Sequence, residues 1–381
     1  AFAYEVYPAE FMINFSRNSV GVSLDNSVLR GGWKGATGNY LSGINFNIEL
    51  NNEYGLYSRN SVIDLESRLK VYSNNRGALL ENSKAYLNEC LFVGNQHEGL
   101  HCVNSTVQYN KNIQQISNGQ TPNLEEYQFD FSGNGRHLVL DQGSNIKPTL
   151  ASSMPTNYGR VRFTDNHGMT HTGSEDALSR LVPPVSVTNN SNAVFVHPIF
   201  KSTSLTTAEG KSLLGECLEV SKNSTVLCQG SEAGASVFEG ARAVGNSLGY
   251  SNNLKTIGIY TSDNSTIEFN GPTVAFNFGV AVMADNNSVV NFNPPKSPGS
   301  QVLDVSGWNL DNSKNHTSVE LHSTNACLVA NNNSTVNMKD LGDFNAHWTA
   351  TNASSPDYDT GNLGTSSYTS GGFMQFYPNP V

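Results

Sequence analysis

The sequence predicts an all-β protein, a right-handed parallel β-helix with coils of about 22 residues and Asn-rich corners. The first observation is a recurring Asn-Ser pair, which stands at Asn60, Asn82 and Asn104 at intervals of 22 residues. The second is the apolar–polar alternation after each pair, which is typical of a strand with one buried face. The third is the return of the pair further along the chain, at Asn190, Asn223, Asn264, Asn287 and Asn333.

Asparagine suits the corners of such a coil. It tolerates the left-handed backbone conformation that most residues avoid, and its amide can bond to nearby backbone groups. The N-S-T triplets also match the acceptor sequence for N-glycosylation, but they fall on the repeat itself, which favours the corner. Because stacked amides can donate to one neighbour and accept from the other, we expect an amide ladder formed by Asn60, Asn82, Asn104, Asn190, Asn223, Asn264, Asn287 and Asn333.

The strands that flank the corner are visible in four segments that align without a gap: 217–228, 258–269, 281–292 and 327–338. The third and fifth residues after the Asn are mostly apolar, and the residue between them is polar in most repeats. We therefore expect Val290, Phe292, Val336 and Met338 to face the interior, and Asn291 and Asn337 to face outward. Since strands lie about 4.8 Å apart, about ten coils would make a rod roughly 50 Å long.

The repeat divides the chain into three parts. Residues 1–50 are expected to form an N-terminal cap or connector, because solenoid ends need covering. Residues 51–345 are expected to form the β-helix, interrupted by an irregular insertion at about 113–187. Within that insertion, Ser174 and Pro183 would start and stop one short helix. Residues 346–381 are expected to form a C-terminal tail or trimer-contact segment, and the absence of a leader at Ala1 suggests a fragment or a processed product.

Composition excludes several classes of function. The formal net charge of −10 argues against nucleic acid as a partner and against attachment to anionic lipid. No apolar run approaches the 18 residues of a membrane-spanning segment. The five cysteines form no C-x-x-C arrangement, so neither a zinc site nor a disulfide framework is indicated. We interpret them as small core residues of a protein made in a reducing cytoplasm, with no metal and no cofactor.

The N-S-T-V-x-[FM] corners, the cysteines of an Asn-rich β-helix and the polar, aromatic C-terminus resemble the tailspike and tail-fibre proteins of tailed bacteriophages. The resemblance covers roughly residues 50–345, and a protein of a giant phage is one candidate within it. It implies a homotrimer in the virion, attached to other phage tail or baseplate proteins and made in the bacterial host cytoplasm. It also implies contact with the host surface, with depolymerase activity in some members.

Glycosidase chemistry needs two carboxylates that flank a sugar. Asp64, Glu66, Glu89 and Glu98 lie on or near consecutive coils, so a pair could form on one face. The alternative is that outward carboxylates of a solenoid are ordinary solvated surface. The insertion adds two further weak candidates, Glu175 and Asp176.

Candidate binding residues come from two sources. Aromatic side chains on an outward face suit stacking on sugars, and the insertion holds the densest group of ionisable side chains. His167 and His171 are four residues apart, but Gly168 between them makes a metal-binding helix improbable. The signatures of pectate lyases and polygalacturonases, which share the β-helix fold, are absent. The candidates are Tyr57, Tyr86, Arg136, His137, Arg160, His167, His171 and Tyr260.

The resemblance to tailspike and tail-fibre proteins implies a structural protein of a phage tail, a spike or fibre. Together with the candidate residues, it predicts that this protein binds host cell-surface polysaccharide and does no chemistry. One alternative is a tailspike depolymerase of the same fold, either a glycoside hydrolase or a polysaccharide lyase. The other is an exported bacterial adhesin, against which the free cysteines count, because exported proteins meet oxidising conditions.

Overall fold

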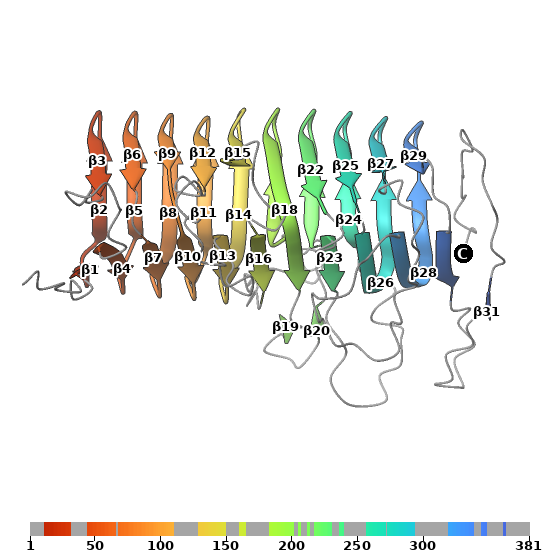
Figure 1. Ribbon diagram of the computed structural model, residues 1–381, viewed down its shortest axis with the longest axis horizontal. Helices are drawn as coiled ribbons and strands as arrows, with labels where there is room; N and C mark the ends of the chain where they lie inside the picture. Colours follow the sequence, from red (N-terminus) through yellow and green to blue (C-terminus); the bar gives the residue numbers. More distant parts are fainter. Residues whose placement is uncertain are drawn as a thin grey trace, which may run out of the picture.

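The protein is a solenoid of parallel strands, stacked side by side along one axis (Figure 1). This computed structural model describes residues 11–31, 44–65, 68–109, 129–149, 160–164, 183–201, 205–206, 212–213, 217–230, 236–239, 257–271, 273–293, 319–338, 344–348 and 361–362. Within these ranges the regular structure is all β. No helix in them is long and apolar enough to cross a membrane. The predicted all-β fold of stacked parallel strands is therefore confirmed.

The strand pairings form three parallel series, which we name sheets A, B and C. Each coil passes through A, B and C in that order, and each strand pairs with the equivalent strand of the next coil. Sheet A contains β1 (Phe11–Ser16), β4 (Ile44–Glu49), β7 (Leu69–Tyr72), β10 (Cys90–Val93), β13 (Phe129–Ser132), β16 (Arg160–Thr164), the end of β18 (Asn192–Lys201), β23 (Ser236–Glu239), the beginnings of β26 (Thr273–Ala284) and β28 (Val319–Ala330), and β30 (Phe344–Trp348).

Sheets B and C follow the same order. Sheet B contains β2 (Val20–Asp25), β5 (Tyr54–Arg59), β8 (Arg76–Glu81), β11 (Glu98–Val103), β14 (Arg136–Asp141), β17 (Val185–Val187), β21 (Leu218–Val220), β24 (Ile257–Thr261) and the ends of β26 and β28. Sheet C contains β3 (Val28–Gly31), β6 (Val62–Leu65), β9 (Lys84–Tyr86), β12 (Thr106–Tyr109), β15 (Asn145–Pro148), the beginning of β18, β22 (Thr225–Gln229), β25 (Thr266–Asn270), β27 (Val289–Asn293) and β29 (Thr335–Met338).

Two short antiparallel pairings lie outside the three series. β19 (Leu205–Thr206) pairs with β20 (Ser212–Leu213), and β31 (Gly361–Asn362) pairs with β30. They are the antiparallel pairings among the described strands.

The interior is a continuous column of apolar side chains from all three sheets. The predicted register of sheet C is correct, because Val290 and Phe292 are fully buried, Val336 is buried, and Asn291 and Asn337 are half-buried on the outer face. The side chain of Met338 lies outside the described residues. Phenylalanines of sheet A stack on one another at ring-centroid distances of 4.6 to 5.1 Å, close to the strand spacing: Phe92, Phe131, Phe163, Phe200 and Phe238.

The corner between sheets B and C is the one that the Asn-Ser pairs form. The asparagine adopts the left-handed conformation, with φ of 50° at Asn60, 49° at Asn82 and 47° at Asn104, as expected. Later coils add a second left-handed residue before it, such as Asn286 before Asn287. The same conformation holds at the other predicted positions, Asn190, Asn223, Asn264 and Asn333.

The continuous ladder at this corner is made by the serine rather than by the asparagine. The backbone N–H of Ser61 donates to Oγ of Ser83 at 3.1 Å, and that of Ser83 donates to Oγ of Ser105 at 3.0 Å. The asparagine side chains are exposed, and one amide–amide bond joins Asn104 to Asn82 at 2.7 Å. The serine ladder continues through Ser144, Ser191, Ser224, Ser265, Ser288 and Ser334.

A buried amide ladder does exist, at the opposite corner between sheets A and B. The backbone N–H and the side-chain Nδ2 of Asn51 both donate to Oδ1 of Asn74, at 3.0 and 2.9 Å. Asn74 makes the same two bonds to Asn95, and Asn95 makes them to Asn134. The residue before each asparagine is left-handed, as Leu50 and Ser73 are. Both corners therefore have the same arrangement: a left-handed residue is followed by a buried polar side chain, and this side chain accepts the backbone N–H of the preceding coil.

Glycines make room for this amide ladder. A Cβ on Gly55 would lie 2.7 Å from Nδ2 of Asn74, and one on Gly77 would lie 2.2 Å from the carbonyl oxygen of Gly99. The next coil has His137 at this position, buried and 3.4 Å from Nδ2 of Asn134. The described amide ladder ends at that coil.

Two predicted boundaries need correction, and a third prediction is not tested. Residues 11–31 and 44–50 belong to the first coils, since β1 to β3 pair with β4 to β6, so they are not a separate cap. The predicted insertion at 113–187 contains β13 to β17, which continue the three sheets. The helix expected between Ser174 and Pro183 and nearly all of the tail 346–381 lie outside the described residues.

Longer connections occur at the two ends of sheet A. Residues 32–43, 110–128, 150–159 and 294–318 connect sheet C to sheet A, and residues 165–182 and 240–256 connect sheet A to sheet B. The B–C corner, by contrast, ranges from two residues (26–27) to four (331–334). Its turns form the regular row along the upper edge of Figure 1.

The amide ladder should contribute measurably to stability. Asn74→Ala removes an acceptor of two hydrogen bonds and leaves buried donors unpaired, so we expect it to lower the free energy of unfolding by about 2–4 kcal/mol. Asn52→Ala, at an exposed position of the same corner, should cost less than about 0.5 kcal/mol. Chemical denaturation of both variants measures the difference, and equal losses would contradict this role of Asn74.

Aromatic stacking in the interior gives a second prediction. Phe292 is fully buried and stacks on Phe269 at 4.9 Å, so Phe292→Ala should cost about 3–5 kcal/mol by opening a cavity between coils. Asn291→Ala changes the neighbouring outward position and should cost about 1 kcal/mol or less. Thermal and denaturant unfolding of the two variants tests the assigned register. A larger loss for Asn291→Ala would show that it is wrong.

The described cysteines should be chemically inert in the folded protein. All four are buried as reduced thiols, and burial raises the pKa of Cys90, Cys102 and Cys228. Because the thiolate is the reactive form, a Cys327→Ser variant should show almost no reaction with a thiol-specific reagent until it is unfolded. Four thiols should then react. Rapid reaction of the native variant would contradict the burial.

Candidate functional site

The outer face of sheet B over the first five coils combines charged and aromatic side chains, and it is our candidate binding face. The outward residues of each sheet B strand are two or three positions apart, and equivalent residues of successive coils lie side by side. Three outward rows therefore run along this face. They start at Val20, Ser23 and Asp25 in β2 and end at Arg136, Val139 and Asp141 in β14.

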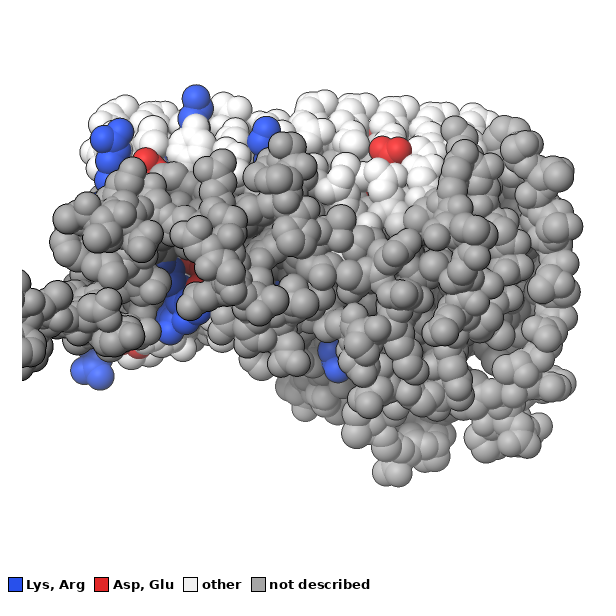
Figure 2. All heavy atoms as spheres, viewed as in Figure 1, with Lys and Arg blue, Asp and Glu red and all other residues white. Residues whose placement is uncertain are grey.

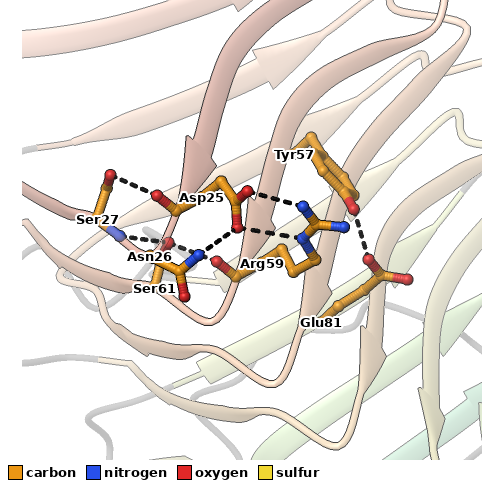
Figure 3. A network of polar contacts seen from close by, with 7 residues as sticks. All are labelled: Asp25, Asn26, Ser27, Tyr57, Arg59, Ser61 and Glu81. Atoms are coloured by element: carbon orange, nitrogen blue, oxygen red, sulfur yellow. Dashed lines mark hydrogen bonds and ion pairs between the residues drawn. The ribbon is translucent and has the colours of Figure 1, made fainter.

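The row nearest the B–C corner alternates in charge over its first three coils. Arg59 makes a two-bond ion pair with Asp25, through Nε at 3.1 Å and Nη2 at 2.7 Å (Figure 3). Glu81 stands next to Arg59 on the following coil and accepts a 2.6 Å hydrogen bond from the Tyr57 hydroxyl. The bond from Arg59 lowers the pKa of Asp25, and the bond to Glu81 raises the pKa of Tyr57. These contacts hold the Tyr57 ring in place on the face.

The row nearest the A–B corner also alternates. Tyr54, Arg76, Glu98 and Arg136 are partners in register on successive coils. Nη1 of Arg76 donates to the Tyr54 hydroxyl at 2.8 Å, and its guanidinium lies 5.5 Å from the centre of the Tyr54 ring. Nε of Arg76 is 3.7 Å from Glu98. Each cation therefore has an aromatic or acidic neighbour on the adjoining coil.

The central row is less polar. It contains Tyr57, Leu79, His101 and Val139, of which Val139 is buried. The Tyr54 and Tyr57 rings lie 5.8 Å apart at an angle of 40°. Burial lowers the pKa of His101, an effect that Glu98 opposes and Arg136 reinforces. At neutral pH this histidine is therefore neutral. Tyr54, at the start of the row nearest the A–B corner, and Tyr57, in the central row, give the face an aromatic platform beside the charged side chains.

The same face continues towards the later coils. Glu219 and Tyr260 extend the central row beyond Ser186. Oγ of Ser186 donates to Glu219 at 3.3 Å, and Oγ of Ser221 donates to it at 3.1 Å. Burial lowers the pKa of Arg136, whereas the negative charges of Glu98 and Glu219 act to raise it.

The structure separates the predicted carboxylates. Asp64 lies on sheet C beside Arg30, Glu89 lies before β10 of sheet A beside Arg68, and Glu98 lies on sheet B. No two of these three therefore share a face, because they lie on or next to three different sheets of the solenoid. Glu66, Glu175 and Asp176 lie outside the described residues.

The predicted binding residues also lie on different parts of the solenoid. Tyr57, Arg136 and Tyr260 share the outer face of sheet B, whereas Tyr86 lies on sheet C. His137 is buried at the end of the amide ladder and takes no part in the surface. Arg160 is the first residue of β16, and its side chain, like His167 and His171, lies outside the described residues.

Sequence reasoning missed most of the face, although a signal was present. Tyr54, Arg76 and Glu98 are spaced by 22 residues, as are Arg59 and Glu81. Comparing equivalent positions of successive repeats would have shown the alternation of charge. Charged residues are otherwise sparse on the view in Figure 2, where uncharged side chains make up most of the described surface.

Within the described ranges, no group of three or more His, Cys, Asp or Glu side chains is placed to hold a metal ion. Comparison with known proteins identifies no family, because no family model, no curated protein and no solved structure matches this chain.

Proposed function

We propose that this chain is a spike or fibre protein of a phage tail that binds host cell-surface polysaccharide through the outer face of sheet B. In this proposal the solenoid is a right-handed parallel β-helix whose shortest coils have about 22 residues. The observation that carries the binding proposal is the platform of Tyr54 and Tyr57 next to ionic side chains that are held by bonds between coils. The virion assignment rests on the resemblance to tailspike and tail-fibre proteins.

The face has the chemistry that sugars require. Tyrosine rings offer apolar surfaces with a polar tip, and carboxylate and guanidinium groups make strong hydrogen bonds with hydroxyl groups. The side chains are held by bonds between coils, so ligand binding would cost little side-chain entropy. The rows run along the axis for several coils, which suits an extended polymer better than a single sugar.

Binding without cleavage is favoured over a depolymerase by the placement of the carboxylates. Glycoside hydrolysis uses two carboxyl groups about 5–10 Å apart on either side of the bond that breaks. The described candidates Asp64, Glu89 and Glu98 point to three different sides, and each has an arginine partner. The depolymerase remains the alternative that the experiment below tests.

The cysteines favour a protein made in a reducing cytoplasm over an exported adhesin. Four of them are buried as reduced thiols within the solenoid. We extend the proposal to a homotrimer that joins other tail or baseplate proteins, and its support is the resemblance alone. Light scattering in native buffer tests this part, and a monomer would contradict it.

The binding proposal predicts which substitution weakens polysaccharide binding. The full chain should bind one or more polysaccharides purified from a panel of bacterial surfaces, measured by calorimetry, without releasing new reducing ends or unsaturated products. Tyr57→Ala should weaken this binding at least about tenfold, because it removes half of the aromatic platform.

Tyr86→Ala is the matched control, since Tyr86 is an outward, half-buried tyrosine on sheet C. It should bind as the unmodified chain does. Equal losses for both variants would contradict the placement of the site, and release of product would establish the depolymerase instead.

A further inference from the structure

We propose that the polymer recognised by the outer face of sheet B carries no net negative charge, so that it is a neutral glycan rather than a polyuronate, a sialylated chain or a phosphorylated polymer. This inference rests on the proposed function and specifies its substrate class. The argument comes from the pairing of charges between neighbouring coils.

Polyanion binding depends on protein cations that are available to the ligand, because these cations replace the counterions condensed on the polyanion and release them. On this face the cations already have acidic neighbours. Arg59 uses Nε and Nη2 on Asp25 and has Glu81 on its other side. A carboxylate of the ligand that approached Arg59 would meet Asp25 and Glu81 at close range.

The second row repeats this arrangement. Arg76 contacts the Tyr54 hydroxyl and lies 3.7 Å from Glu98. Arg136 donates from Nε to the carbonyl oxygen of Pro183 at 3.2 Å, and both Glu98 and Glu219 attract its charge. An acidic group therefore flanks every arginine of the two rows.

The sum of these charges is unfavourable for an anion. The first five coils of the face hold three arginines, Arg59, Arg76 and Arg136, against four carboxylates. Glu219 on β21 adds a fifth, so the formal charge is about −2 when all are ionised. His101 adds no positive charge at neutral pH, because burial lowers its pKa. The chain as a whole carries −10, which repels a polyanion at longer range. The five carboxylates are those of Asp25, Glu81, Glu98, Asp141 and Glu219.

A neutral glycan avoids this repulsion and still finds partners. A guanidinium has five N–H donors, so Arg59 keeps donors beyond the two that it gives to Asp25. Hydroxyl groups can accept from these donors and can donate to carboxylate oxygens. The sugar rings can lie on Tyr54 and Tyr57 without bringing a charge to the face.

The test uses two classes of purified bacterial polysaccharide, one with neutral repeats and one with uronate, sialic acid or phosphate in each repeat. We expect the full chain to bind members of the neutral class, with a Kd that changes less than about twofold between 50 and 500 mM NaCl. Binding of an acidic polymer that depends on Tyr57 and weakens steeply with salt would overturn the inference but keep the proposed function. Binding of neither class would remove both.

A charge variant tests directly whether the acidic neighbours of the arginines exclude anionic polymers. Sodium alginate is the polyuronate probe. Glu98→Gln removes the acidic neighbour that Arg76 and Arg136 share, so it should raise alginate affinity at 50 mM NaCl by at least about tenfold. Glu89→Gln makes the same change in net charge on sheet A, beside Arg68, and should not. An equal gain in both variants, or a gain in neither, would show that the charge pairs of this face do not exclude anions.

Discussion

The solenoid depends on how it satisfies the backbone N–H groups at its corners. A left-handed residue turns the chain at each corner, and the next residue points its N–H along the axis towards the following coil. A buried serine Oγ or asparagine Oδ1 of that coil accepts the hydrogen bond. Because an unpaired buried N–H costs about 1–3 kcal/mol, a coil shifted by one residue would lose both corner bonds as well as its buried apolar residues. The two ladders therefore set the register of all three sheets.

The outer surface follows from that register. Residues at equivalent positions are placed in straight rows, so charges 22 residues apart become neighbours, as Arg76 and Glu98 do. Where a ladder is present, the connection between the two strands at that corner is short. The serine ladder runs from Ser27 to Ser334 at a corner of two to four residues. The described amide ladder ends at Asn134, and the next connection of that corner, residues 165–182, is much longer.

Sequence reasoning predicted the strands, the inward residues and the left-handed asparagines, since these depend on local patterns of two to five residues. It assigned the buried ladder at the B–C corner to the asparagine, although the serine that follows at every repeat was an equally constant signal. The second corner was missed because its left-handed residue varies, from Leu50 and Ser73 to Gly94 and Gly133. No pair of residues marks it, and Asn51, Asn74 and Asn95 are spaced by 23 and 21 residues. The binding face depends on contacts between coils, which the pattern within one coil does not show.

Native-state hydrogen exchange tests the ladders most directly. In the Ser105→Ala variant, the amide of Ser83 loses its acceptor, whereas the amide of Ser61 keeps its bond to Oγ of Ser83. We predict that exchange at Ser83 becomes about 10- to 100-fold faster, as expected for a loss of roughly 1.4–2.8 kcal/mol of local protection. Exchange at Ser61 should change much less. Unchanged protection at Ser83 would contradict the claim that buried side chains hold successive coils in register.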